Sequence, residues 1–481
     1  MPSHVPVSVR RSVLTPLERD GRARTVERRL AQAIQLGVFA EGEQLPSEAT
    51  LAAQFGVATV TLREALVELR RHGLVETRRG RGGGSFVRAP RIDAEQQAHE
   101  RLRRCSADEL RDLLDHYAAL AAHGARLAAA RASAVDLDRL CTHVRAFEDA
   151  RSDAERRRAD VRLHVELPSI ARSRRLTTGT MDLHAELGAF LWLTFSGASA
   201  LSAVQEHRAI AAAVGAGDAE RAAGLAAAHA ARELRALIGM RVAAEPARET
   251  DGAPAAVLDT AAVALEEVFG VIAAVEEEVR GLHAAAERLG ERLRRADLGP
   301  LTSLLREALG RLPIMAGLGM IFAPEVLADE TRWIEWLCAT DDGPPEPLVT
   351  TLDPAAADFY DYEAAEWYRE PLEHGGRWIA GPFLDHSGTD AHIFTLTQPV
   401  LVAGGRPLGV TGADLAVEAV ESIVRPALAA VPGRAALLNH RGRVIAANTS
   451  DHLPGTLYPD DFDARVTRDP RIPWAVVVGE H

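Results

Sequence analysis

Residues 22–90 constrain the fold most, because helical and strand-like patterns follow one another there in a fixed order. Apolar residues recur at helical spacing in three stretches, which end at Gly37, Gly56 and Gly73. Ser47 precedes the second stretch and can cap it. The second and third stretches are joined by a short turn that contains glycine. This arrangement predicts a helix-turn-helix.

A hairpin rich in glycine and arginine follows the third helix. Two short β-prone runs, at residues 75–77 and 86–87, flank the sequence RRGRGGGS. Glycine lets the backbone approach a partner closely, and Arg78, Arg79 and Arg81 supply positive charge. A solvated hairpin tip would need no partner. Beside a helix-turn-helix, however, the hairpin predicts a wing that lies against duplex DNA.

The net charge differs in sign between the first 90 residues and the rest of the chain. The net formal charge is −13 over 481 residues, yet the first 90 residues hold 14 Arg against 9 Asp and Glu, a net charge of +5. The remaining residues therefore carry −18. This distribution disfavours a polyanionic partner for most of the chain and favours one for its N-terminal part.

Residues 45–87, LPSEATLAAQFGVATVTLREALVELRRHGLVETRRGRGGGSFV, resemble the winged helix-turn-helix of the GntR family of bacterial transcription regulators. The resemblance implies that a homodimer binds a double-stranded DNA operator, with Arg63 on the recognition helix and Gly82 in the wing at DNA-contacting positions. The chain departs from the family at Ala49 and Thr59, where arginine is usual, so the family's common operator sequence is not expected here. The predicted DNA-contacting residues are Ser47, Thr59, Thr61, Arg63, Arg78, Arg79, Arg81 and Gly82.

Residues 105–240 show amphipathic helices rich in Ala and Leu, without a strand pattern. Asp160 and His164 are four residues apart and share a helix face, and His207 and His229 lie on two later helices. One carboxylate and three imidazoles can ligate a divalent cation and leave positions for water or an effector carboxylate. A single D-x-x-x-H pair is nonspecific, because most histidines are structural.

The segments ADVRLHVEL and EHRAIAAAVGAGDAERAAGLAAAHAAREL resemble the FCD domain, the helical effector module of the FadR-type GntR branch. The resemblance implies an all-α domain and a divalent metal ion, zinc or similar, held by Asp160, His164, His207 and His229. A vestigial site that keeps the ligand types without the metal is the alternative. Other histidines, His116, His123 and His184, match no such position and are expected to be structural.

A metal-dependent hydrolase that carries a DNA-binding domain is the competing interpretation of the same four residues. The chain contains no HExxH, GxSxG or Walker-type motif to support it. We therefore expect a regulator and not an enzyme.

Residues 241–257 have the composition of a linker, and the region 258–481 beyond it predicts a third, α+β domain. Residues 258–310 have the pattern of one or two long helices. Short β-prone segments separated by turns follow. They are residues 314–324, 332–340, 347–353, 377–385, 392–402, 407–415 and 435–447.

This third region resembles the Cache domain, the PAS-like sensor of chemoreceptors and sensor kinases. The resemblance is carried by Trp367-Tyr368, Trp378, Gly381-Pro382-Phe383, the turn and strand at residues 404–410, and Asp414. It implies that Tyr360, Trp367, Tyr368 and Asp414 surround a small ligand. The arginine that holds a ligand carboxylate in amino-acid-binding members is replaced by Ala365, so that contact is missing.

The expected pocket is acidic and aromatic once Trp378 and Asp385 are included. Aromatic faces stabilise an ammonium group by about 0.5 to 2 kcal/mol per contact, and carboxylates add to this. The composition predicts an amine or an amino-acid-like effector. The alternative is that the aromatic residues are simply the core of the domain and the acids a solvated loop.

The chain as a whole predicts a dimeric, ligand-responsive DNA-binding protein with an N-terminal tail at residues 1–21. Repression relieved by ligand is the family-level expectation, with activation as the alternative. Cys105, Cys141 and Cys338 are too few and too widely spaced for a disulfide framework. No segment offers the roughly 20 uncharged apolar residues that a bilayer span needs. The expected location is the cytoplasm, without contact to a membrane.

Overall fold

The computed structural model of the chain divides into two compact units. The first runs to Ala243 and the second from Ala244 onward, with Ser106–Asp108 counted with the second. The predicted tail, residues 1–21, lies outside the described residues. The described residues are 22–35, 39, 41–78, 80, 83–88, 94–187, 190, 198–243, 253–340, 343–356, 359–385, 391–459 and 464–479.

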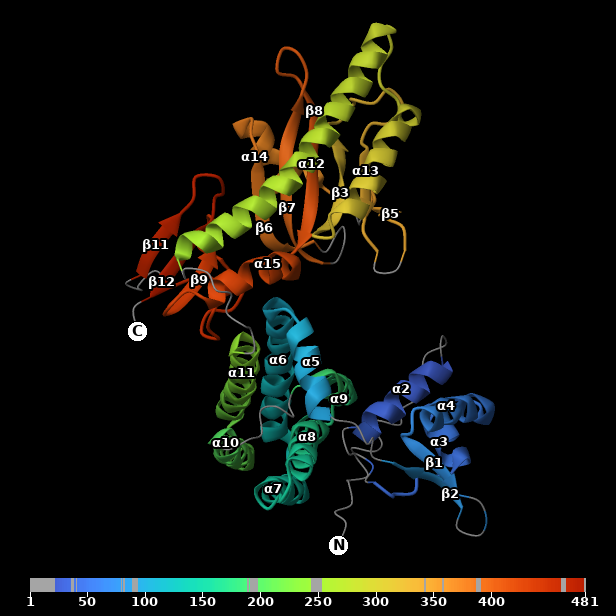
Figure 1. Cartoon of the computed structure of the whole chain (residues 1–481). Coiled ribbons are helices and arrows are strands. Elements are labelled where there is room, and N and C mark those ends of the chain that lie inside the picture. The colour runs from blue at the N-terminus through green and yellow to red at the C-terminus, as the bar shows by residue number, and fades with distance from the viewer. Residues whose placement is uncertain are drawn as a thin grey trace. The chain divides into compact units, whose positions relative to one another are not determined.

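The first unit begins with the predicted winged helix-turn-helix (Figure 1). Ser47 caps the second helix by accepting a hydrogen bond from Thr50 N at 3.2 Å, and Gly56 ends that helix with a φ of 64°. The two strands pair antiparallel, with Val75 opposite Val87. The elements are α2 (Arg22–Gln35), α3 (Glu48–Phe55), α4 (Thr59–Arg71), β1 (Val75–Arg78) and β2 (Gly84–Val87).

Among the described residues, seven further helices follow in the first unit and confirm the predicted all-α region. Residues 159–171 of the α8 segment are buried apart from Arg162, which is half-buried, so this helix lies at the centre of the bundle. Its Leu163 and Leu167 pack in one core with Ile210 from α10. The helices are α5 (Ala94–Arg104), α6 (Ala107–Arg131), α7 (Ala134–Glu148), α8 (Asp153–Ile170), α9 (Arg174–Leu187), α10 (Ala198–Gly215) and α11 (Ala219–Ala243).

The second unit is α+β, as predicted, with two antiparallel sheets. The order of the six-stranded sheet is β5-β4-β3-β8-β7-β6, and that of the four-stranded sheet is β10-β9-β12-β11. The helices are α12 (Pro254–Arg288), α13 (Gly299–Arg311), α14 (Glu366–His374) and α15 (Val417–Ala429). The strands are β3 (Met315–Phe322), β4 (Ile334–Cys338), β5 (Glu346–Pro347), β6 (Trp378–Leu384), β7 (His392–Leu401), β8 (Pro407–Ala416), β9 (Arg434–Leu438), β10 (Val444–Ala447), β11 (Ala464–Arg468) and β12 (Ala475–Gly479).

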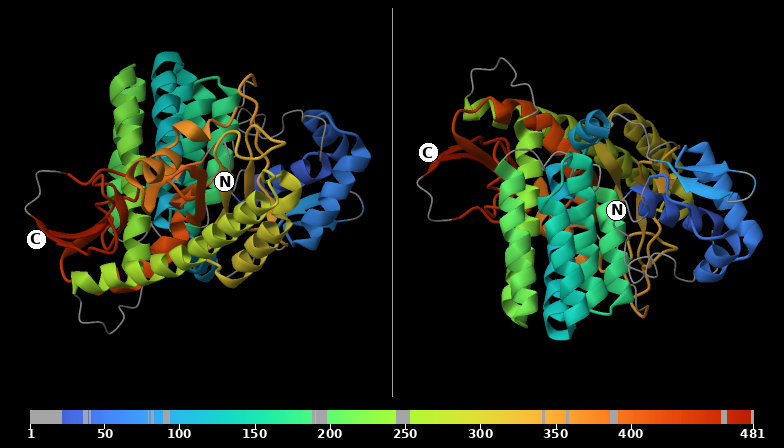
Figure 2. Two further views of the ribbon diagram at one scale, coloured as in Figure 1. Left: turned by 90° about the horizontal axis from the view of Figure 1, so that it is seen from above. Right: turned by 90° about the horizontal axis from the view of Figure 1, so that it is seen from below.

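The six-stranded sheet is buried on both faces. The long helix α12 and its neighbour α13 lie side by side on one face (Figures 1 and 2), where Leu318 and Met320 of β3 point into the main core. Because side chains alternate along a strand, Ile321 points to the opposite face. There it joins a separate cluster of aromatic residues that includes Trp336 and Trp367.

The strand predicted at residues 347–353 is confirmed only at its start. Pro347 pairs with β4, and Leu348 N donates a hydrogen bond to Trp336 O at 3.0 Å, but the chain then leaves the edge of the sheet, with Val349 91% exposed. The apolar run suggested a strand, but Leu348 instead lines a cavity. Within the described residues, no helix combines the length and apolar character that a bilayer span requires.

Candidate functional site

The winged helix-turn-helix exposes four of the five predicted DNA-contacting residues that the structure describes. Ser47, Thr59, Arg63 and Arg78 are exposed, and Thr61 is half-buried. The predicted Arg79, Arg81 and Gly82 of the wing lie outside the described residues. The described DNA-contacting candidates therefore come from the start of α3, from α4 and from the end of β1.

Arg63 projects from α4 with 65% of its side chain exposed. Its Nε donates a hydrogen bond to Glu48 Oε2 on α3 at 2.7 Å. An exposed ion pair of this kind contributes little to stability, so Arg63 can exchange Glu48 for a base or a phosphate at small cost. In the wing, the guanidinium of Arg78 lies 4.2 Å from the centre of the Phe86 ring, which orients that side chain along the hairpin.

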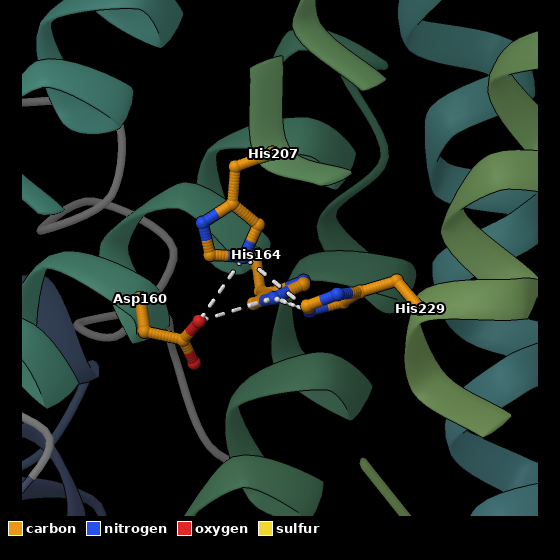
Figure 3. Close-up of side chains that lie close together, drawn as sticks. All are labelled: Asp160, His164, His207 and His229. Carbon is orange, nitrogen blue, oxygen red and sulfur yellow. Dashed lines mark hydrogen bonds and ion pairs between the residues drawn. The ribbon is translucent and has the colours of Figure 1, made fainter. Parts of the chain in front are cut away.

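The four predicted metal ligands meet in the interior of the helical bundle. Asp160 and His164 come from α8, His207 from α10 and His229 from α11, and their side chains converge (Figure 3). All four are buried, with at most 3% of each residue exposed. Their ligand atoms all lie within 4.8 Å of one another.

The spacing of these atoms suits a divalent metal ion. His164 Nε2 lies 3.1 Å from His229 Nε2, and His207 Nε2 lies 3.3 Å from the same atom. Asp160 Oδ1 lies 3.5 Å from His164 Nε2 and 3.3 Å from His207 Nε2. Ligands about 2.0 to 2.1 Å from a tetrahedral zinc ion are about 3.3 Å apart. Neither oxygen of Asp160 forms a hydrogen bond, and a cation between it and the ring nitrogens would satisfy the buried carboxylate. The residues present therefore fit the metal.

Surrounding groups prepare the imidazoles as ligands. His229 Nδ1 is 2.5 Å from Glu206 Oε2, and Glu206 is held in turn by Arg232 Nε at 2.7 Å. A proton on Nδ1 leaves the lone pair of Nε2 directed into the cluster. Burial lowers the pKa of His229 to about 3 and also lowers the pKa of His207. Both rings are thus neutral at pH 7, which is the form that binds a metal.

Asp160 is ionised in this environment. Burial alone would raise its pKa, but His164 and His207 lower it well below the ordinary value. The cluster offers one carboxylate and three imidazoles, the donor set of a zinc-type site.

The structure places further residues at this centre that the sequence analysis did not assign to it. Glu233 Oε1 lies 3.4 Å from His229 Nε2, and His184, which we expected to be structural, stacks on His164 with ring centres 5.3 Å apart. The ring of Tyr117 meets His184 edge-on at 5.1 Å. A sequence signal for Glu233 existed, since it follows His229 by four residues, as His164 follows Asp160.

A second candidate site is a cavity in the six-stranded sheet of the second unit. The enclosed cavity measures only about 20 Å³, and the wider hollow around it, which is partly open to solvent, measures about 340 Å³. Four of the predicted ligand-binding residues, Tyr360, Trp367, Asp385 and Asp414, line it. The other lining residues are Ile321, Ile334, Trp336, Leu348, Phe383, Ile393 and Thr395.

Contrary to expectation, Tyr368 and Trp378 do not line this cavity. Tyr368 packs edge-on against Tyr362, with ring centres 5.1 Å apart. Trp378 stacks on His374 at 5.6 Å and donates its Nε1 hydrogen to Glu366 at 3.2 Å. Both residues support the walls of the domain instead.

The cavity pairs a buried acid with an unused hydrogen-bond donor. Burial raises the pKa of Asp414 to about 7, against the lowering effect of a hydrogen bond from Thr395 Oγ1 at 2.7 Å. The Trp336 Nε1 group forms no hydrogen bond. A Cβ on Gly317 would lie 2.5 Å from Trp336 Nε1 and 3.2 Å from Asp414 Oδ2, so these two polar groups flank one glycine. Among the described residues that line the cavity, none is basic.

Three family models match the chain. The model of bacterial regulatory proteins of the gntR family covers residues 22–84, and the FCD domain covers residues 112–232. The first PDC sensor domain of methyl-accepting chemotaxis protein-like proteins covers residues 301–422.

A relative in sequence shows to which family the chain belongs. The HTH-type transcriptional regulator RmpR of Mycobacterium gastri is 39% identical over 241 residues, which cover 50% of this chain and 88% of the relative. The chain belongs to the GntR family. Another HTH-type transcriptional regulator, from Mycobacterium tuberculosis, is 36% identical over 166 residues, 34% of this GntR-family chain and 68% of its own length.

Solved structures also resemble parts of this GntR-family regulator. Methyl-accepting chemotaxis protein X is 18% identical, with 47% of this chain and 97% of that chain covered at a TM-score of 0.33. A putative GntR regulator from Rhodococcus sp. RHA1 is 21% identical, with 45% and 98% covered at a TM-score of 0.27. The family models and RmpR confirm the predicted GntR head, FCD domain and Cache-like sensor domain.

Proposed function

We propose that this regulator binds a pseudo-palindromic DNA operator as a homodimer and that a small molecule controls the binding. Membership of the GntR family and the exposed side chains of α4 and of the wing stem support the DNA-binding part. Two recognition helices related by a dyad would read two half-sites about one helical turn apart. In this role the protein acts on DNA in the cytoplasm.

The observation that carries the proposed control is the buried cluster of Asp160, His164, His207 and His229. A divalent metal held by these four residues would link α8, α10 and α11 through one centre and would act there as a Lewis acid. A carboxylate effector at this centre is one candidate input. The residues that orient the ligands, Glu206 above all, would keep the site assembled between binding events.

The cavity beside Asp414 is the second candidate input. Its lining favours an amine or amino-acid-like effector, because Asp414 and Asp385 can pair with an ammonium group while Trp336 donates to an acceptor on the same molecule. A ligand at either site changes DNA binding only by the difference in its affinity for the two arrangements of the DNA-binding heads. Repression relieved by ligand is the proposed direction.

Fluorescence anisotropy with DNA from the regulator's own upstream region tests the proposal. The purified protein should bind a fragment at fixed, modest salt, and light scattering should give the mass of a dimer. Zinc chloride or a panel of amines should change the DNA affinity. A protein that binds no such fragment under any of these conditions, or that turns over candidate ligands, would favour the hydrolase alternative.

A further inference from the structure

Glu233 is a buried carboxylate beside the proposed metal centre. It lies on α11 one turn after His229, so the two side chains share a helix face. Its Oε1 is 3.4 Å from His229 Nε2. That separation lies within the range of 3.1 Å to 3.5 Å over which neighbouring ligand atoms of the cluster contact one another. Only 1% of Glu233 is exposed.

Glu233 lacks the partner that a comparable buried acid in the same bundle has. Neither of its oxygens forms a hydrogen bond. By contrast, the fully buried Glu166 accepts a hydrogen bond from Arg139 Nε at 2.9 Å. Arg232, the neighbour of Glu233 in sequence, is bonded to Glu206 at 2.7 Å. Burial raises the pKa of Glu233 well above the ordinary value, because its charged form has no cationic partner, and a cation beside it would supply that partner.

The charge balance of the proposed metal centre also favours a role for Glu233. Three neutral imidazoles and the carboxylate of Asp160 would leave a divalent cation with one positive charge uncompensated in a buried site. The carboxylate of Glu233 makes the assembly neutral. The hydroxyl of Tyr117, which interacts with Glu233, is uncharged and cannot do so.

We propose that Glu233 is a fifth protein ligand of the metal and occupies the position at which an effector carboxylate would otherwise reach it. This inference rests on the proposed metal centre. It makes that centre a closed, structural one, which a carboxylate enters only by displacing Glu233. Control by small molecules is then left to the cavity beside Asp414.

Zinc affinity of the full-length protein tests the first half of this proposal. Zinc chloride is titrated against a competing chelator for the wild type, for Glu233→Gln and for the control Glu220→Gln. Glu220 lies on the same helix, with 79% of its side chain exposed. Glu233→Gln should weaken zinc binding about tenfold or more, because even residues that only orient a ligand cost about that much when changed. Glu220→Gln should bind zinc like the wild type.

Acetate binding tests the second half. Isothermal titration of sodium acetate into the zinc-loaded proteins should give a Kd for Glu233→Ala that is about tenfold or more below that of the wild type, because removal of the side chain opens a position on the metal. A variant that merely fails to fold would bind neither zinc nor acetate, so stronger acetate binding identifies the specific effect.

The outcomes separate this inference from the proposed function. Equal zinc affinity of the wild type and Glu233→Gln, together with equal acetate affinity of the wild type and Glu233→Ala, overturns the role of Glu233 and leaves the four-residue centre intact. Failure of the wild type to bind zinc overturns both. Weaker zinc binding together with stronger acetate binding supports the fifth ligand.

Discussion

The two candidate sites both bury a pair of carboxylates, yet they surround the carboxylates with different groups. In the helical bundle, Asp160 and Glu233 lie among three imidazoles whose nitrogens are lone-pair donors. In the second unit, Asp414 and Asp385 line a cavity with aromatic rings and hydrogen-bond donors. The imidazoles and carboxylates of the bundle suit a metal ion better than an organic amine. The aromatic rings and carboxylates of the cavity suit an organic amine better than a metal ion.

The same comparison explains how the protonation of the acids differs. Asp160 stays ionised because imidazoles lie beside it, and its pKa is well below the ordinary value. Asp414 has one hydrogen bond from Thr395 and an acidic neighbour in Asp385, so burial prevails and its pKa rises to about 7. Asp160 therefore offers a charged oxygen ligand at neutral pH, whereas Asp414 is only partly ionised there.

The largest expected effect is the loss of metal from the bundle site. Replacing His207 and His229 by alanine removes two of the imidazoles and should abolish bound metal, as measured by elemental analysis of the purified protein. His116→Ala, an exposed histidine of α6, is the matched control and should retain it. Undiminished metal in the double variant would show that the metal lies elsewhere and that the contrast between the two sites is wrong.

The next effect concerns the cavity. Asp414→Asn keeps the shape of the side chain but removes its charge, so it should weaken amine binding by the value of a charged hydrogen bond, about 1.5 to 3 kcal/mol. Calorimetric titration of the full chain with amines measures it. Glu373→Gln, which changes an exposed acid of α14, should have no effect. If Asp414→Asn binds only anions or binds amines unchanged, the cavity is not a cation site.

These two sites differ in how far the sequence could predict them. Asp160 and His164 share a helix face, a local relation that spacing alone reveals. The same rule placed Glu233 beside His229, but the sequence could not show that this face is buried against α8. The cavity depends on strand pairing: Trp336 of β4 and Asp414 of β8 meet only because β3 lies between them with Gly317. Such long-range register is not visible in local pattern.

The fold was predicted best where its periodicity is local. The three helices and the hairpin of the DNA-binding head follow from apolar spacing and from glycines such as Gly56, which adopts a positive φ. The predicted Trp367 and Tyr368 are neighbours on α14 and point about 100° apart, which local pattern alone cannot orient relative to the sheet. Trp367 faces the cavity and Tyr368 packs against Tyr362.

Operator binding can show which of the two candidate sites, the metal cluster or the cavity, controls the DNA-binding domain. Arg63→Ala should weaken operator binding by about 1 to 3 kcal/mol if Arg63 contacts a base. Anisotropy at fixed salt measures it, with Arg103→Ala on α5 as a control for a lost exposed arginine. Repeating the titration with added zinc chloride and with an amine that binds the cavity shows which ligand shifts the wild-type affinity. An unchanged affinity for Arg63→Ala would exclude the base contact.

The smallest effect is a dependence of amine binding on pH. Because the pKa of Asp414 is raised to about 7, its carboxyl is mostly protonated below pH 7 and must lose that proton to pair with an ammonium group. Amine affinity should therefore rise by about tenfold between pH 6 and pH 8, while the amine itself stays protonated.

The same raised pKa of Asp414 means that the free energy of unfolding of the ligand-free protein should fall as pH rises from about 4 to about 7, since the unfolded chain ionises first. Asp414→Asn should remove both dependences. Zinc binding in the bundle, where His229 is already neutral and Asp160 already ionised, should change less over the same interval, and an equal change at both sites would mean that their acids are not tuned differently.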